Sequence, residues 1–575
     1  MTEIEQGVLK KSSKKTRDYA RMLYENKGCI IVQSDLTILL ETDNPMFEEA
    51  RDALAGFAEM VKSPEYIHTY KLTQLSLWNA ASACISAEQV IDELRQFAKH
   101  ELPGVVINRI LDWGKRYGRV KLLIENGKFV LRCDDKYIAT EIANSKQVST
   151  YLLSRIDDTA FVVDIAYRGH IKQALIIAEY PAEDLAGYRD AASLSFELRD
   201  NALSGATFTL RPYQIEAVDI FHANGESRGG HGVIVLPCGA GKTIVGIAAM
   251  AKLQTETLIL TTAITAIRQW ISELVNKTTL TADQIGEYSS DKKEIKPVTI
   301  STYQILGVSE KHRELINSRE WGLIIYDEVH TLPAPVFRMT AELQSKRRLG
   351  LTATLIREDG LQSDVFSLIG PKRYEVPWKV LEKRGYIATV ECFEVRVSLA
   401  DSMRMDYAVA DKRQKFRIAA ENPNKFVALQ KLLTEHTGKH ILIIGLYINQ
   451  LAEIAKLLNA PLITGKTKST KRDELYQSFR KGEFSIIVVS KVANYAIDLP
   501  DANVAIEISG TFGSRQEEAQ RLGRILRPKP GENRAWFYTL VTSDTVEEGF
   551  AAHRQLFLAE QGYPYRVTDY KSPYP

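Results

Sequence analysis

Two series of short apolar runs, each separated by helical stretches, constrain the fold of this chain more than any other feature. The first series begins after residue 205 and comprises GVIVLP, TLILTT, VTIST, GLIIYDE and RRLGLTAT. The second begins near residue 440 with HILIIGL, SIIVVSK and NVAIEIS. Such runs are typical of parallel strands that are buried on both faces and joined by crossover helices. The sequence therefore predicts an α/β protein with two parallel-sheet lobes.

A phosphate-binding loop is predicted between the first strand and the first helix of the first lobe. Its residues are Leu236, Pro237, Cys238, Gly239, Ala240, Gly241, Lys242 and Thr243. The two glycines let backbone N–H groups surround phosphate oxygens, and the N-terminus of the next helix adds a favourable dipole. Lys242 would neutralise the β- and γ-phosphates of ATP, and Thr243 would offer its hydroxyl to Mg²⁺. The second series contains no such loop, so we expect one nucleotide site.

A pair of carboxylates ends another strand of the same lobe. Asp327 and Glu328 follow the apolar residues of GLIIYDEVH. Carboxylates there lie at the carboxyl edge of the sheet, beside the phosphate loop. Asp327 could hold the metal ion directly or through water, and Glu328 could orient and deprotonate the attacking water. Such a pair alone is usually solvated surface, but together with the loop it indicates ATP hydrolysis.

A third candidate element, QRLGRILRP, lies in the second lobe between residues 520 and 528. Its candidate catalytic residues are Gln520, Arg524 and Arg527. The two arginines are three positions apart, hence on one face of a helix that Pro528 would end. They could reach across a cleft to the γ-phosphate, where an arginine finger contributes about 10³ to 10⁵ in rate. By itself, a surface helix with salt bridges is the commoner explanation of this pattern.

The residues before the first lobe predict two smaller domains. Three segments within residues 72–118 have the apolar spacing of helices, and two alternating runs follow around Asn126-Gly127, a dipeptide typical of a tight hairpin. This is the order of a winged-helix domain, which could contact DNA or protein. Trp78, Trp113 and Tyr117 could stack on bases, but their helical spacing favours the core. FVVDIAY and ALIIAEY then indicate strands of a small mixed domain or connector.

The expected boundaries follow from these patterns. They are 1–20 for a basic tail, 21–132 for the winged-helix-like domain, 133–204 for the mixed domain, 205–395 for the first lobe and 396–575 for the second.

Charge and cysteine content limit the classes of function. The 74 basic and 72 acidic residues give a formal charge of +2, so any contact with nucleic acid must be local. The 5 cysteines include no C-x-x-C pair, so neither a disulfide framework nor a zinc or iron–sulfur site is expected, and a reducing compartment is favoured. We find no signal peptide and no apolar run of about 18 residues, so an intracellular protein without a membrane segment is expected.

In this order the three elements resemble those of superfamily 2 helicases, and closely those of the XPB family of DNA repair and transcription helicases. Six further segments resemble motifs of these families. They are the Q motif with Arg211 and Gln214, motif Ia with Arg268 and Gln269, motif Ib with Ser301, Thr302 and Tyr303, motif III with Thr352 and Thr354, motif V with Ser490, Lys491 and Asp498, and the RED motif with Arg357, Glu358 and Asp359. The RED motif is the most diagnostic of the XPB family, and the resemblance is strong over about 205–565.

The resemblance implies RecA-like lobes that use ATP and Mg²⁺, and an ATP-dependent 3′→5′ DNA helicase or duplex translocase with a role in DNA repair. It implies that the Q motif reads adenine and that a nuclease or repair assembly is the partner. Motifs Ia, Ib and V would grip the DNA backbone without reading its sequence. Residues 405–426 stand in place of the family's thumb-like insertion. The long acidic linker of eukaryotic members is absent, which favours a bacterial source and a cytoplasmic, nucleoid-associated location.

Two alternatives stay open at this point. A duplex translocase could remodel bound proteins or branched DNA without separating strands, and an ATP-gated scaffold could recruit a nuclease while hydrolysing ATP slowly.

Overall fold

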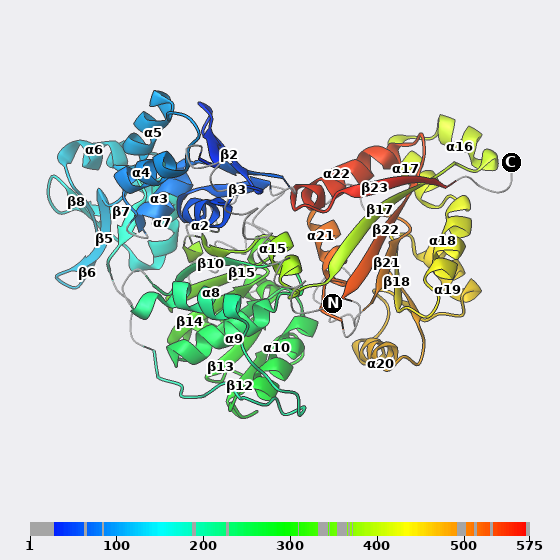
Figure 1. Cartoon of the computed structure of the whole chain (residues 1–575). Helices are drawn as coiled ribbons and strands as arrows, with labels where there is room; N and C mark the ends of the chain where they lie inside the picture. The colour runs from blue at the N-terminus through cyan, green and yellow to red at the C-terminus, as the bar shows by residue number, and fades with distance from the viewer. Residues whose placement is uncertain are drawn as a thin grey trace, which may run out of the picture.

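The computed structural model describes the chain over residues 28–62, 66–82, 85–186, 191–225, 229–308, 310–331, 343, 345–353, 365, 368–370, 372–490, 502–510, 515–529 and 533–570. These residues form four sheets, two small and two large. Figure 1 shows the two N-terminal units in blue and cyan, the first lobe in green and the second lobe in yellow to red. The expected basic tail, residues 1–20, lies outside the described residues.

The first unit combines an antiparallel sheet with four helices. Its strands are β1 (Ile30–Val32), β2 (Thr37–Glu41), β3 (Glu59–Lys62) and β4 (Ile67–Lys71), in the order β1-β2-β4-β3. Its helices are α2 (Phe47–Phe57), α3 (Gln74–Ser82), α4 (Ala87–Phe97) and α5 (Gly104–Gly114). The three helices predicted after residue 72 are thus confirmed, and Trp78 is buried in the core as expected. The sheet was not predicted, because its strands have only three to five residues.

The predicted hairpin is confirmed as β5 (Val120–Glu125) and β6 (Lys128–Cys133), with Asn126 and Gly127 at positive φ in the turn. It pairs with β7 (Leu152–Arg155), β8 (Ala160–Val163) and β9 (Ala182–Asp184) in the order β7-β8-β6-β5-β9, beside α6 (Lys136–Asn144) and α7 (Arg168–Ile177). This sheet has a hydrophobic core of its own. The helices and the hairpin therefore belong to different units, and a boundary after residue 132 would cut through the second sheet.

One strand expected in this second unit is wrong. The run ALIIAEY lies mostly in α7, where Ile171, Ala174 and Leu175 are buried at helical spacing. A short apolar run does not by itself distinguish a buried strand from a buried helix face. FVVDIAY is confirmed as a strand, since it contains most of β8.

The first lobe is a seven-stranded parallel sheet in the order β12-β13-β11-β14-β15-β10-β16. The strands are β10 (His231–Val235), β11 (Thr257–Thr261), β12 (Ile285–Tyr288), β13 (Val298–Thr302), β14 (Trp321–Asp327), β15 (Ser345–Thr352) and β16 (Lys372–Glu375). Its main helices are α8 (Pro212–His222), α9 (Lys242–Leu253), α10 (Ile264–Lys277), α11 (Tyr303–Val308) and α12 (Glu310–Asn317). All five apolar runs predicted for this lobe are strands, with hydrophobic cores on both faces.

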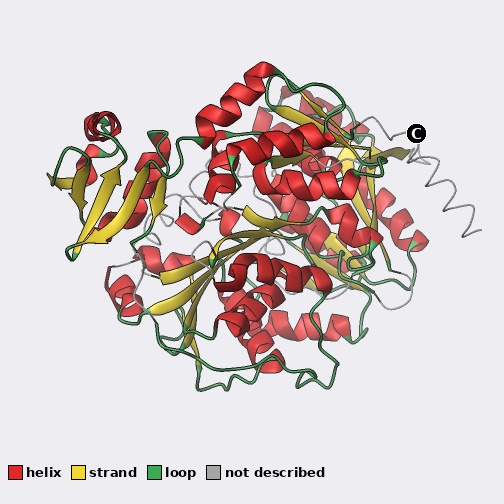
Figure 2. Ribbon diagram, turned by 60° about the vertical axis from the view of Figure 1, so that its left-hand side comes forward, coloured by secondary structure: helices red, strands yellow, loops and turns green. Residues whose placement is uncertain are grey.

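The second lobe repeats this architecture with the order β19-β20-β18-β21-β22-β17-β23. The strands are β17 (Thr389–Val397), β18 (Ile441–Ile444), β19 (Leu462–Ile463), β20 (Ile486–Val489), β21 (Val504–Glu507), β22 (Arg534–Thr542) and β23 (Tyr565–Tyr570). The helices are α16 (Arg404–Val409), α17 (Lys412–Ala420), α18 (Asn424–Glu435), α19 (Ile448–Leu457), α20 (Ser469–Arg480), α21 (Arg515–Gly523) and α22 (Val546–Glu560). Figure 2 shows helices against both large sheets. A boundary after residue 395 would fall within β17, so the lobes divide earlier, before Thr389.

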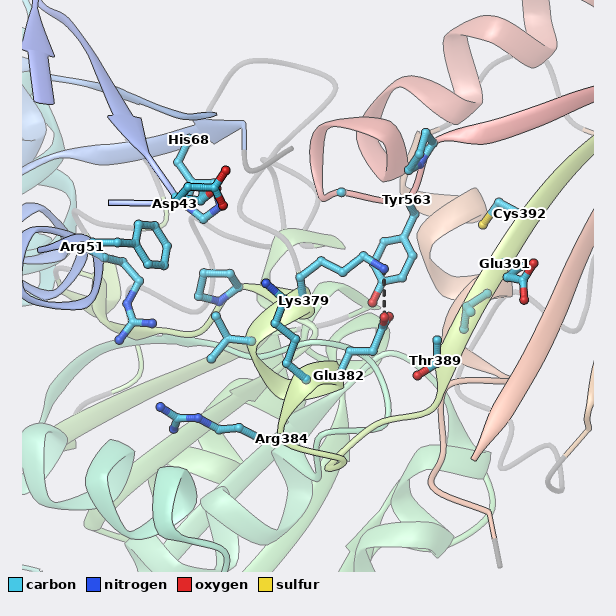
Figure 3. Close-up of a pocket in the computed structure, with 18 of the residues that line it drawn as sticks. Asp43, Arg51, His68, Lys379, Glu382, Arg384, Thr389, Glu391, Cys392 and Tyr563 are labelled. Carbon is cyan, nitrogen blue, oxygen red and sulfur yellow. Dashed lines mark hydrogen bonds and ion pairs between the residues drawn. The ribbon is translucent and has the colours of Figure 1, made fainter. Parts of the chain in front are cut away.

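A short helix, α15 (Trp378–Lys383), connects the lobes and borders a cavity of about 620 Å³. Figure 3 shows that residues of the first unit, of α15 and of the second lobe line this cavity. Lys379 Nζ lies 2.9 Å from Glu382 Oε1 and 4.1 Å from the centre of the Tyr563 ring. The first unit thus reaches the connection between the lobes. In the described parts of the chain, no helix is both long and apolar enough to span a membrane.

Candidate active site

The predicted phosphate loop joins β10 to α9, as the sequence indicated. Gly239 has φ 80° and Gly241 has φ 81°, a backbone region that residues with a Cβ rarely adopt. A Cβ on Gly241 would also lie 2.7 Å from Gln214 Nε2. The backbone shape of the loop therefore requires both glycines, and the neighbouring Gln214 requires Gly241 as well.

Residues at the N-terminus of α8 hold the loop through hydrogen bonds to its backbone. The Tyr213 hydroxyl donates to the carbonyl of Ala240 at 2.6 Å, and Gln214 Nε2 donates to the same carbonyl at 3.1 Å. Gln214 Oε1 accepts from the backbone N–H of Arg211 at 2.9 Å. Both ends of the Gln214 amide are thus engaged within the protein, so in this geometry Gln214 holds the loop and does not face a base. Adenine recognition through Arg211 stays a prediction.

The two carboxylates meet the loop at the end of β14. Lys242 Nζ lies 3.2 Å from Glu328 Oε1, and Trp270 Nε1 donates to Asp327 Oδ2 at 2.9 Å. Glu328 has φ 50°, a left-handed conformation that costs roughly 1–3 kcal/mol for a residue other than glycine. Backbone strain of this kind concentrates at functional positions. The structure therefore brings together the predicted lysine and both acidic residues.

Burial and charge separate the pKa values of the two acids. Burial, reinforced by the negative charge of Glu328, raises the pKa of Asp327 to about 6. Burial also acts on Glu328, but the charges of Lys242 and His330 outweigh it and hold the pKa of Glu328 below its usual range. Glu328 is therefore ionised at neutral pH, as a general base must be.

Neighbouring motifs are linked to this pair by hydrogen bonds. His330 Nδ1 lies 2.6 Å from Thr352 Oγ1 and 3.4 Å from Glu328 Oε2. The Tyr303 hydroxyl donates to the carbonyl of Asp327 at 2.7 Å. Thr352 and Tyr303, which were among the predicted DNA or coupling residues, thus lie against the ATP site.

Three further residues of the site were not singled out from the sequence. They are Tyr213, which bonds to the loop at Ala240, Trp270, which bonds to Asp327, and His330, which lies beside Glu328. Each belongs to a segment that matched a motif, and that position is the one signal that could have marked them.

The second lobe contacts the phosphate loop directly. A Cβ on Gly523 would lie 2.2 Å from Cys238 Cβ, and a Cβ on Gly239 would lie 3.4 Å from the carbonyl carbon of Leu526. Burial lowers the pKa of Arg524, and the carboxylate of Glu328 is among the charged groups near it. The backbone N of Arg527 would also lie 3.5 Å from a Cβ on Gly239, and the positive charge of Arg527 lowers the pKa of Arg524 further. Gln520 is half-buried on α21. The arginine segment therefore reaches the loop across the lobes.

The prediction that both arginines share a helical face is wrong. α21 ends at Gly523, and Arg524 and Arg527 lie in the turn beyond it. After Gly523 the N–H groups of Arg524 and Ile525 bond three residues back, to Arg521 and Leu522, so the helix tightens and stops before Pro528. The Leu526 carbonyl then accepts from Ala388 N at 2.8 Å, which fixes the turn to the connection between the lobes.

Several predicted DNA contacts are not open to solvent. Ser301, Thr302 and Tyr303 are 0%, 7% and 3% exposed, and Ser490 is 4% exposed, so these side chains offer little or no surface to DNA in this geometry. They are buried because they end strands packed on both faces or follow directly on them. Arg268 is exposed and pairs with Asp291 at 3.5 Å, and Gln269 is half-buried. Outside the described residues lie Thr354, Arg357, Glu358, Asp359, Lys491 and Asp498.

The oxygen donors beside the loop fit a magnesium ion that arrives with a nucleotide. Among the described residues, no group of three or more His, Cys, Asp or Glu side chains could hold a metal ion. Mg²⁺ usually binds one or two carboxylates together with substrate phosphates. The Thr243 hydroxyl and the Asp327 carboxylate are hard donors of that kind, and the bond from Trp270 fixes the carboxylate.

Comparison with known proteins gives three family matches. The model described as "ERCC3/RAD25/XPB C-terminal helicase" matches residues 381–574, "Helicase conserved C-terminal domain" matches residues 30–157, and "Type III restriction enzyme, res subunit" matches residues 207–357. Together they reach from β1 into the residues beyond β23.

Curated relatives match nearly the whole chain. The "DNA 3'-5' helicase XPB" of Kineococcus radiotolerans is 51% identical over 547 residues, which are 94% of this chain and 96% of that protein. The protein of the same name from Mycobacterium tuberculosis is 52% identical over 94% of this chain and 98% of its own length. The "General transcription and DNA repair factor IIH helicase/translocase subunit XPB" of Antonospora locustae is 34% identical over 95% and 82%. With these identities over nearly full length, the chain belongs to the XPB family of helicases.

Proposed function

We propose that this chain is an ATP-dependent 3′→5′ DNA helicase, in which ATP hydrolysis between the two lobes drives the opening of duplex DNA. The observation that carries the proposal is the contact of the Arg524 segment of the second lobe with the phosphate loop and Glu328 of the first. Because the site is divided between the two lobes, the rate of hydrolysis depends on their position relative to each other. The bacterial relatives named as 3'-5' DNA helicases support the substrate and the direction.

The chemistry begins with the pairing of Lys242 and Glu328. The γ-phosphate of ATP competes for Lys242 and draws it from Glu328, which lies 3.2 Å away. Glu328 is then available to orient the attacking water and to accept its proton. Arg524 stabilises the charge that develops on the phosphoryl oxygens, because a guanidinium can bond two of them at once.

Thr243 and Asp327 would hold Mg²⁺, which supplies charge neutralisation of the phosphates when it is bound. Trp270 keeps the Asp327 carboxylate in one orientation through its 2.9 Å hydrogen bond. Because the pKa of Asp327 is about 6, the carboxylate is mostly ionised at neutral pH and can accept the cation.

Coupling to DNA follows from the contacts around the acidic pair. Tyr303 bonds the backbone at Asp327, and Thr352 bonds His330 beside Glu328. Movement of either motif on DNA would therefore displace the acidic residues, through one contact from Tyr303 and through two contacts from Thr352. Arg268 is an exposed candidate for the DNA backbone, and Lys491, Asp498 and the segment Arg357 to Asp359 are further candidates carried by the family resemblance.

Duplex translocation without strand separation is the second candidate, since the Antonospora relative is named a helicase/translocase subunit. Strand displacement from duplexes with a 3′ or a 5′ tail, measured beside DNA-stimulated ATP hydrolysis, separates the two. A helicase separates the strands of the 3′-tailed duplex, whereas a translocase hydrolyses ATP on duplex DNA without separating them. A repair role within a larger assembly is part of the proposal, supported by the name of the Antonospora relative as a subunit of a DNA repair factor. A nuclease partner and a cytoplasmic, nucleoid-associated location stay predictions from the sequence.

A further inference from the structure

Four ionisable side chains are buried together behind the segment that carries Arg524. They are Glu507 at the end of β21, Glu518 and Arg521 on α21, and Arg554 on α22, and none is more than 2% exposed. Arg521 Nη1 lies 3.0 Å from Glu507 Oε2, and Arg554 Nη2 lies 3.1 Å from Glu507 Oε1. Glu507 thus bridges two arginines that belong to two different helices. We refer to these four residues as the buried charge cluster.

Glu518 completes the cluster on its other side. Its Oε2 lies 3.6 Å from Arg554 Nε, and its Oε1 accepts a hydrogen bond from the Tyr565 hydroxyl of β23 at 2.9 Å. Burial and the charge of Glu507 raise the pKa of Glu518 to about 8, whereas the two arginines outweigh burial and lower the pKa of Glu507 to about 2. At neutral pH, Glu507 is therefore the ionised partner of the two arginines.

The packing around the cluster leaves little room for independent movement. A Cβ on Gly510 would lie 2.0 Å from Glu507 Oε1 and 2.2 Å from Arg554 Cζ. Buried ion pairs of this kind are weak contributors to stability, because the desolvation of each charge offsets their attraction. What they do provide is one fixed geometry, since each charge must keep its partners. The cluster therefore locks α21, α22 and β21 to one another.

The locked end of α21 is the end that carries the arginines of the ATP site. Arg521 lies two residues before Gly523, and Arg524 follows Gly523 directly. Gly523 itself is so close to the phosphate loop that an added Cβ would clash with Cys238. We propose that Glu507 and Arg554 are positioning residues for Arg524 and Arg527, acting through Arg521. This inference rests on the proposed ATP hydrolysis and assigns a role to α22, which contributes no residue to the nucleotide site described above.

The lobe offers a matched control for this role. Lys425 Nζ lies 2.7 Å from Glu547 Oε1, and both side chains are fully buried. Glu547 also belongs to α22, but Lys425 comes from α18 and bonds the carbonyl of Ile508 at 2.9 Å. This pair thus has the burial and charge of the cluster without an ion pair to α21.

The experiment compares steady-state ATP hydrolysis by the full chain on saturating DNA. Arg554→Lys keeps the charge and loses the planar fork that forms ion pairs with both acids. We expect kcat to fall about 10- to 100-fold, because a displacement of about 1 Å at a reacting group can cost that much. KM for ATP and the affinity for DNA should stay within about twofold. Lys425→Met should lower the thermal midpoint but leave kcat of the folded protein near that of the wild type.

A double variant separates positioning from general weakening. In an Arg524→Ala background, Arg554→Lys should lower kcat no further, because the group that it positions is gone. If Arg554→Lys folds poorly, Tyr565→Phe removes only the hydroxyl bond to Glu518 and should lower kcat about two- to fivefold, again without effect in that background. Additive losses, or an equal loss of kcat in Lys425→Met, would overturn the inference. A wild-type chain that hydrolyses no ATP would instead overturn the proposed function.

Discussion

Gly523→Ala tests how tightly the two lobes meet at the phosphate loop. The added Cβ would lie 2.2 Å from Cys238 Cβ, whereas ordinary van der Waals contact begins at 3.4 Å. The lobes must therefore separate locally by about 1.2 Å, the difference between the two distances. Because Arg524 follows Gly523 directly, a shift of this size at the γ-phosphate should lower kcat for ATP hydrolysis about 10²-fold.

The assay is DNA-stimulated ATP hydrolysis, with nucleotide affinity measured separately by equilibrium titration. We expect nucleotide affinity to change little, since the loop itself is intact. Cys238→Gly should restore much of the lost kcat in the double variant, because it removes the atom that clashes, whereas Cys238→Ala keeps that Cβ and should not. Wild-type kcat in Gly523→Ala, or equal behaviour of the two Cys238 variants, would refute the reasoning.

Three further predictions concern the acidic pair and its neighbours. Mg²⁺–ATP affinity should weaken as the pH falls through about 6, because protons then compete for Asp327, and Trp270→Phe should move this loss to higher pH, since the Trp270 bond lowers the pKa of that carboxyl; a pH-independent affinity would count against the assignment. Glu328→Gln should retain nucleotide binding and lose hydrolysis by at least about 10²-fold, which single-turnover measurements check; failure to bind nucleotide would argue against a general base. Thr352→Val breaks the bond to His330 and should lower the base pairs opened per ATP more than it lowers DNA-stimulated ATP hydrolysis; equal losses would remove Thr352 from the coupling path.

Much of the fold could be predicted because the buried strands of the two lobes are local signals. Each apolar run such as TLILTT becomes a strand in the expected lobe, and the glycines of the phosphate loop have the positive φ that their type allows. Local patterns failed where tertiary contacts decide the structure. α21 ends at Gly523, which lies against the phosphate loop, and no spacing within QRLGRILRP reveals this contact.

The site was predictable in its charged residues but not in their supports. Lys242, Asp327 and Glu328 meet as expected, since the carboxyl ends of neighbouring parallel strands share one edge. Trp270 comes from α10, and its bond to Asp327 depends on how that helix packs. The burial of Ser301 likewise depends on the layers that cover β13.

Strand displacement by the full chain tests the central claim most directly. With ATP and Mg²⁺, we expect the labelled strand to be released from a 3′-tailed duplex, little release from a 5′-tailed duplex, and none from either with Arg524→Ala. Release from the 5′-tailed duplex alone would contradict the proposed direction. ATP hydrolysis without release from either duplex would contradict helicase action, and unchanged release by Arg524→Ala would contradict a nucleotide site shared between the lobes.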